Sequence, residues 1–236
     1  MPARLLAVLI ALAPVIFGAD AVSDAALQIQ HVTHTDTFPL PAGGALRFEH
    51  SIGELDIEGW DRPEVQVTVI KSTKGFYPAK DRVATADLDR VHVSAEIKGK
   101  DVVVSTGYPH HSFPLNFPWA EPGIEVEYQV KAPMAAAMFV DHGKGEVHFY
   151  NVSGDVQAKV HNGSIMLALA PDSRYNIQAS SDWGAPISYF PGTSHRRFWL
   201  IGHQFTAKSD GGHELALKAG YGDIVIFKNW KPDATQ

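Results

Sequence analysis

The stretch "GEVHFYNVSGDVQAKVHNGSIML", residues 145–167, repeats a short pattern. Glycine recurs every nine residues, at Gly145, Gly154 and Gly163. A β-branched residue lies two positions after each glycine: Val147, Val156 and Ile165. A strand rises by about 3.3 Å per residue, so five strand residues between four-residue corners give strands about 17 Å long. The pattern therefore predicts an all-β protein built from short, repeated strands.

Further copies of this pattern occur on both sides of the stretch. Each copy has a small or polar turn, a glycine and a short strand. The copies are EHSIGELDIEGW (49–60), DHGKGEVHFYNV (141–152), KVHNGSIMLALA (159–170), ASSDWGAPISYF (179–190) and KAGYGDIVIFKN (218–229). Serial repeats of this length favour a β-solenoid-like stack of short strands. Asn162-Gly163 also fits a two-residue hairpin turn, so a two-sheet β-sandwich is the alternative.

Alternation between apolar and polar residues supports the assignment of strands. Val156, Ala158 and Val160 should face the core, while the residues between them face water. No segment after residue 21 has the spacing of a strongly amphipathic helix. The best candidate, 79–90, is interpreted as a loop with at most one helical turn.

The first residues have the features of an export signal. Arg4 precedes the apolar run Leu5–Phe17, and Ala19-Asp20-Ala21 fits the small-x-small cleavage pattern. The apolar run is too short to span a bilayer, which takes about 20 residues. We therefore expect a signal peptide at 1–21 and no membrane span after cleavage. The expected remainder is a flexible segment at 22–37, a single all-β domain at 38–231 and a tail at 232–236.

Composition excludes several kinds of chemistry. The chain has no cysteine, which removes disulfides, thiol catalysis and zinc–thiolate sites. The net charge of −6 does not favour binding to nucleic acid, which requires a basic surface. Together with the leader, these features predict an exported protein of the periplasm or the cell surface.

Three segments carry a resemblance to a known family. They are LDIEGWDRPEVQVTV (55–69), IEVEYQVKAP (124–133) and the glycine repeat of 145–167. Taken together, they resemble the putative-adhesin domain family of bacterial exported proteins, over about residues 38–230. The resemblance implies an all-β, repeat-built domain with no assigned reaction, and it offers no catalytic residues to transfer.

The ionisable residues do not form a catalytic motif. The chain has twelve histidines, but the sequence HExxH is absent. Its acids occupy alternating strand positions or lie beside turn glycines, and no pair stands out. We therefore predict a non-enzymatic protein with no catalytic residues, no metal site and no cofactor.

Binding residues are expected where the chain departs from the repeat. The main departure is the excursion at 107–123, which holds four prolines. A second is the basic and aromatic stretch that begins at residue 195. The candidate ligand-binding residues are His110, His111, Phe117, Trp119, Arg196, Arg197 and Trp199. The predicted function is adhesion, scaffolding or partner binding at the cell envelope, with a protein or a glycan as the partner.

Two other classes of function stay open. An enzyme acting on envelope polysaccharide would need two carboxylates in one groove, flanked by aromatic side chains. A periplasmic metal-binding protein would need three histidines that converge on one point.

Overall fold

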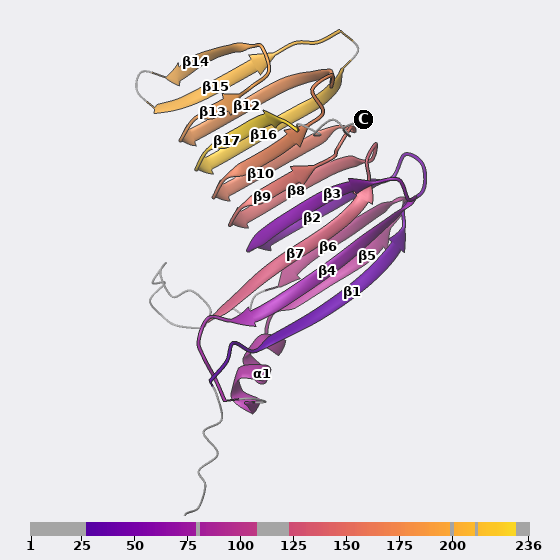
Figure 1. Cartoon of the computed structure of the whole chain (residues 1–236), viewed down its shortest axis with the longest axis vertical. Helices are drawn as coiled ribbons and strands as arrows, with labels where there is room; N and C mark the ends of the chain where they lie inside the picture. The colour runs from indigo at the N-terminus through magenta and orange to yellow at the C-terminus, as the bar shows by residue number, and fades with distance from the viewer. Residues whose placement is uncertain (1–26, 79–80, 108–122, 199–200, 211, 230–236) are drawn as a thin grey trace, which may run out of the picture.

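The computed structural model describes residues 27–78, 81–107, 123–198, 201–210 and 212–229. It consists of two open, mixed β-sheets and one short helix, α1 (Arg82–Asp89). Figure 1 shows the strands stacked across the long axis of the molecule, with α1 at one end. The expected signal peptide, the 108–122 part of the excursion and the tail lie outside the described residues.

One sheet has eight strands and the other has nine. In spatial order, the eight-stranded sheet holds β1 (His31–Pro39), β4 (Glu64–Thr73), β7 (Ile124–Pro133), β3 (Glu54–Trp60), β9 (Val147–Tyr150), β11 (Ile165–Leu169), β17 (Ile224–Lys228) and β13 (Pro186–Ser188). The nine-stranded sheet holds β14 (Thr193–Phe198), β15 (Ile201–Ala207), β12 (Tyr175–Trp183), β16 (His213–Tyr221), β10 (Val156–Asn162), β8 (Ala137–Lys144), β2 (Ala45–Ile52), β6 (Asp101–Gly107) and β5 (His92–Lys98).

The central strands of both sheets pair in parallel. In the nine-stranded sheet, β10 pairs in parallel with β8 and β16. The strands that follow these three along the chain, β11, β9 and β17, lie in the same order in the other sheet. Antiparallel pairs occur only toward the ends, as with β4 and β7 or β12 and β15.

This arrangement confirms the all-β prediction and matches the sandwich that the sequence left as the alternative to a solenoid. The hairpin at Asn162-Gly163 does not form, because β10 and β11 belong to different sheets. The chain instead crosses from one sheet to the other at this glycine.

The core lies between the sheets. Val156, Ala158 and Val160 of β10 are at most 1% exposed, as their alternation predicts. Phe48 of β2 meets Tyr128 of β7 edge to face, with ring centroids 5.8 Å apart. This contact joins the two sheets, because β2 and β7 belong to different ones.

Three of the repeated glycines lie at one corner between the sheets, each just before a strand of the eight-stranded sheet. Gly53, Gly145 and Gly163 have φ angles of 120°, 125° and 144°. Residues with a Cβ rarely adopt this region, whereas glycine does so readily. They are also stacked, because a Cβ on Gly163 would overlap the carbonyl oxygen of Gly145, and one on Gly145 would overlap that of Gly53. Gly154 lies at the opposite crossover, between β9 and β10, and is not part of this column. The column therefore holds every second glycine of the nine-residue period.

Two segments differ from expectation. Residues 31–37, expected in a flexible segment, belong to edge strand β1, which pairs antiparallel with β4 along its whole length. The hydroxyls of Thr35 and Thr68 add a 2.9 Å hydrogen bond to this pairing. Such a polar edge strand lacks the apolar alternation that reveals strands in a sequence.

The loop interpretation of 79–90 was wrong, since Arg82–Asp89 form helix α1. Leu88 is buried, and the Lys71 ammonium donates to its carbonyl oxygen at 3.0 Å and to that of Val91 at 3.2 Å. These tertiary contacts stabilise a helix that its sequence favours weakly. Among the described residues, no helix is long and apolar enough to span a membrane.

Candidate functional site

The parallel pairing of β3 with β9 places two repeats side by side. Their corner glycines, Gly53 and Gly145, begin the strands in the same register. Asp56 is consequently the direct neighbour of His148. Because side chains alternate along a strand, Glu54 and Glu146 point to the same outer face as this pair.

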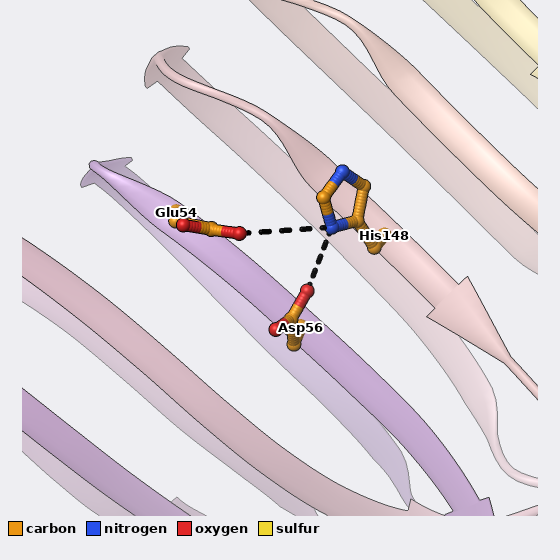
Figure 2. A group of neighbouring side chains, drawn as sticks. All are labelled: Glu54, Asp56 and His148. Atoms are coloured by element: carbon orange, nitrogen blue, oxygen red, sulfur yellow. Dashed lines mark hydrogen bonds and ion pairs between the residues drawn. The ribbon is translucent and has the colours of Figure 1, made fainter.

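Acidic side chains surround His148 on this face (Figure 2). Its Nδ1 lies 2.8 Å from Asp56 Oδ1 and 4.0 Å from Glu54 Oε1. Its Nε2 lies 3.3 Å from Glu146 Oε2 but makes no hydrogen bond. We call these four residues the acidic–histidine cluster.

Burial within the cluster is uneven. His148 is only 9% exposed, although it lies on the outer face of the sheet. The side chain of Glu54 is 55% exposed and that of Asp56 is 36% exposed. The ring is thus held in the protein while the carboxylates reach solvent, so that a small solute has access to the cluster.

Negative charge is concentrated at this point. Partial burial raises the pKa of Glu54, and the neighbouring carboxylates of Asp56, Glu127 and Glu146 raise it further, against an opposing contribution from His148. The Tyr150 hydroxyl also has a raised pKa, mainly through burial and then through Asp56 and Glu54. The cluster is a place where an added positive charge would be stabilised.

A shallow groove of about 490 Å³ runs beside the cluster on the same outer face. Asp56 belongs to both. Most of the lining residues are of polar types. They come from β3, β4, β7, β9 and the segments after β9 and β17: Asp56, Glu58, Gln66, Thr68, Gln129, Val130, Lys131, Tyr150, Asn151 and Asn229. Lys131 and Glu58 form an ion pair at 3.5 Å within it. The groove offers carboxylate, amide, ammonium and hydroxyl groups for hydrogen bonds.

Most residues predicted to bind a ligand lie outside the part of the chain that the structure describes. His110, His111, Phe117, Trp119 and Trp199 lie outside the described residues, and the side chain of Arg197 is not described. Arg196 is exposed on β14, opposite His203 of β15. Because β14 is an edge strand, a charged side chain such as Arg196 helps to prevent the edge from pairing with another chain.

One histidine and two tryptophans, His161, Trp60 and Trp183, lie outside the acidic–histidine cluster. His161 lies in the nine-stranded sheet, where its ring centroid is 6.3 Å from that of Tyr221. Trp60 ends β3, and its Nε1 donates to the Glu64 carbonyl at 2.8 Å. Trp183 is 58% exposed and stacks on Tyr221.

Sequence reasoning missed the acidic–histidine cluster. The signal was nevertheless present in the aligned repeats, because GELD at 53–56 and GEVH at 145–148 place Asp56 and His148 in the same column. That column becomes a contact only if the two repeats are neighbours in space, which the parallel pairing of β3 and β9 provides.

Comparison with known proteins gives little beyond the fold. No family model matches the chain, and no curated protein matches it. One solved structure is described as a putative lipid binding protein from Parabacteroides distasonis ATCC 8503. It is 11% identical over 84% of this chain and 97% of its own, and its TM-score of 0.22 is too low to indicate a shared fold.

A second solved structure is more similar. It is described as a putative cell adhesion protein from Clostridium sporogenes ATCC 15579, and it matches with a TM-score of 0.50 and 14% identity. The match covers 84% of this chain and 100% of that one. At 14% identity this similarity concerns the fold alone. The chain therefore shares its fold with a protein described as a putative cell adhesion protein.

Proposed function

We propose that this protein is an exported, non-enzymatic binding domain of the cell envelope, related in role to adhesins. It binds a glycan of the envelope across the outer face of its eight-stranded sheet. In this proposal the parallel strand pairs act as the rungs of a solenoid-like scaffold, and the excursion at 107–123 adds contacts of its own.

The polar groove on that face is the observation that carries the proposal. Its lining supplies hydrogen-bond donors and acceptors from several strands at once, together with the ring of Tyr150. Sugar hydroxyls are recognised by such groups, and an aromatic ring packs against the apolar face of a sugar. The fold shared with the cell adhesion protein and the signal peptide expected at 1–21 support an exported binding role.

A pair of groove substitutions tests this function. The double variant Gln129→Ala and Lys131→Ala removes two polar groups from the groove, both on β7. We expect at least about a tenfold loss of retention on insoluble envelope polysaccharide, since each lost hydrogen bond to a bound ligand contributes on the order of 1 kcal/mol. Cosedimentation at graded polysaccharide concentrations measures the loss.

The matched control uses the same residue types on the other sheet. Gln157 and Lys159 are exposed at the same spacing on β10, in the outer face of the nine-stranded sheet. Gln157→Ala with Lys159→Ala should retain binding. Equal losses in both double variants, or no retention of the wild-type protein, would contradict the proposal.

One observation favours a second candidate, an enzyme that cleaves polysaccharide. Asp56 and Glu58 line the same groove beside Tyr150. They are two residues apart on β3, so both carboxyl groups point to the same face and enter the same groove, as a catalytic pair requires. Release of reducing ends by the wild-type protein, lost in both Asp56→Asn and Glu58→Gln, would replace the binding function with this one.

A further inference from the structure

The ring of His148 is buried between carboxylates that it cannot satisfy as a neutral group. Nδ1 faces Asp56 at 2.8 Å, and Nε2 faces Glu146 at 3.3 Å. A neutral imidazole carries one N–H and one lone pair. Whichever nitrogen holds the proton, the other directs its lone pair toward a carboxylate oxygen.

A second proton on the ring would remove this conflict, and so would a metal cation at Nδ1. The Nδ1 lone pair then coordinates the cation, and Nε2–H is free to donate to Glu146. Metal-bound histidines commonly donate their second N–H to a carboxylate, which fixes the ring and its tautomer. The buried Nε2, which has no hydrogen bond in the structure, is the atom that this arrangement would use.

We propose that Glu54, Asp56 and Nδ1 of His148 bind a divalent metal ion, with Glu146 orienting the histidine. One ligand atom from each of the three lies within 4.8 Å of the others. Ligand atoms around an ion at 2.0–2.2 Å are about 3–4 Å apart, so the side chains need only small rotations to close on it. Figure 2 shows Glu54 and Asp56 both directed at the same nitrogen.

The donor set selects the class of metal. Two carboxylates alone would suit Ca²⁺ or Mg²⁺, whereas an imidazole favours Zn²⁺ and its neighbours in the first transition row. The exposed carboxylates leave room for water at the remaining positions. The site is therefore expected to bind Zn²⁺ more tightly than Ca²⁺.

Titration calorimetry with ZnCl₂, on chelator-treated protein without a histidine tag, tests the site. We expect one equivalent of Zn²⁺ to bind, with at least tenfold weaker binding of Ca²⁺. His148→Gln should abolish this binding, and Glu146→Gln should weaken it by about 10- to 100-fold. Circular dichroism at the same temperature shows that each variant is folded.

Two controls separate the site from adventitious binding. His161→Gln removes a histidine that meets an aromatic ring on the other sheet, and His110→Gln with His111→Gln removes the adjacent pair of the excursion. Both should keep the equivalent of Zn²⁺. Failure of the wild-type protein to bind it, or unchanged binding by His148→Gln, would overturn the assignment. The assay contains no polysaccharide, so its result does not depend on the proposed function.

Discussion

Gly163→Ala should destabilise the protein by about 4 kcal/mol and lower Tm by roughly 8–16 °C. Gly163 has a φ of 144°, which strains a residue with a Cβ. The added methyl would also overlap the carbonyl oxygen of Gly145, so the two corners must move apart. That movement weakens the 2.7 Å hydrogen bond from Gly163 N–H to the Tyr221 carbonyl. Thermal unfolding followed by circular dichroism measures the change.

Gly99→Ala provides the matched control. Gly99 also has a positive φ, of 67°, but a Cβ there meets no atom within 4 Å. Gly99→Ala should therefore lower the free energy of unfolding by only about 1 kcal/mol, because alanine disfavours this backbone conformation. If both variants lose the same small amount of stability, the stacked column of corner glycines does not determine the fold.

The second large effect is a loss of stability on acidification, which originates at His142. This side chain is fully buried. Its Nε2–H donates to the Gly53 carbonyl at 3.0 Å, and its Nδ1 accepts from the Ser51 hydroxyl at 2.8 Å. Burial lowers the pKa of His142 from 6.5 to about 4, although nearby hydrogen bonds and Asp141 oppose the shift.

The direction of the effect follows from the two pKa values. Below pH 6.5 the unfolded chain binds a proton at this histidine, while the folded chain does not until about pH 4. The stability that neutral His142 provides is therefore complete above pH 6.5 and is lost as the pH falls to 4. The loss is about 3 kcal/mol, or about 1.4 kcal/mol per pH unit.

Urea unfolding at pH 7, 5.5 and 4.5 measures this dependence. The difference in stability between the wild-type protein and His142→Gln should shrink as the pH falls. Taking the difference cancels the contributions of Glu54 and of the other carboxylates, which titrate in both proteins. A difference that stays constant with pH would show that His142 is not held neutral.

The local features of the fold are predictable because short-range rules produce them. Apolar and polar residues alternate in β10 because one face of the strand is buried. Glycine is needed at the corners because the backbone there has a positive φ and makes a close contact. Helix α1 and strand β1 were missed for the opposite reason. Helix α1 is stabilised by hydrogen bonds from Lys71 to the carbonyls of Leu88 and of Val91 just after the helix, and β1 is stabilised by pairing with β4. Neither interaction leaves a periodic pattern in the local sequence.

The order of the repeats in space is not predictable from their order in the chain. The repeat at 218–229, which contains β17, lies between those at 159–170 and 179–190. The repeat at 49–60 likewise lies beside the one at 141–152. The cluster depends on this second pairing. Without it, Glu54 and Asp56 are exposed acids of one strand, and His148 is a histidine of another.

An engineered disulfide tests the central claim, the parallel register of β3 and β9 that creates the site. The chain has no cysteine, so a bond in Asp56→Cys with His148→Cys is unambiguous. The two positions are direct neighbours and should form an intramolecular disulfide on mild oxidation, seen as resistance to alkylation by mass spectrometry. Glu58→Cys with His148→Cys, about 8 Å apart and beyond disulfide reach, should stay reduced. Faster bonding in the second pair, or none in the first, would contradict the register and with it the site.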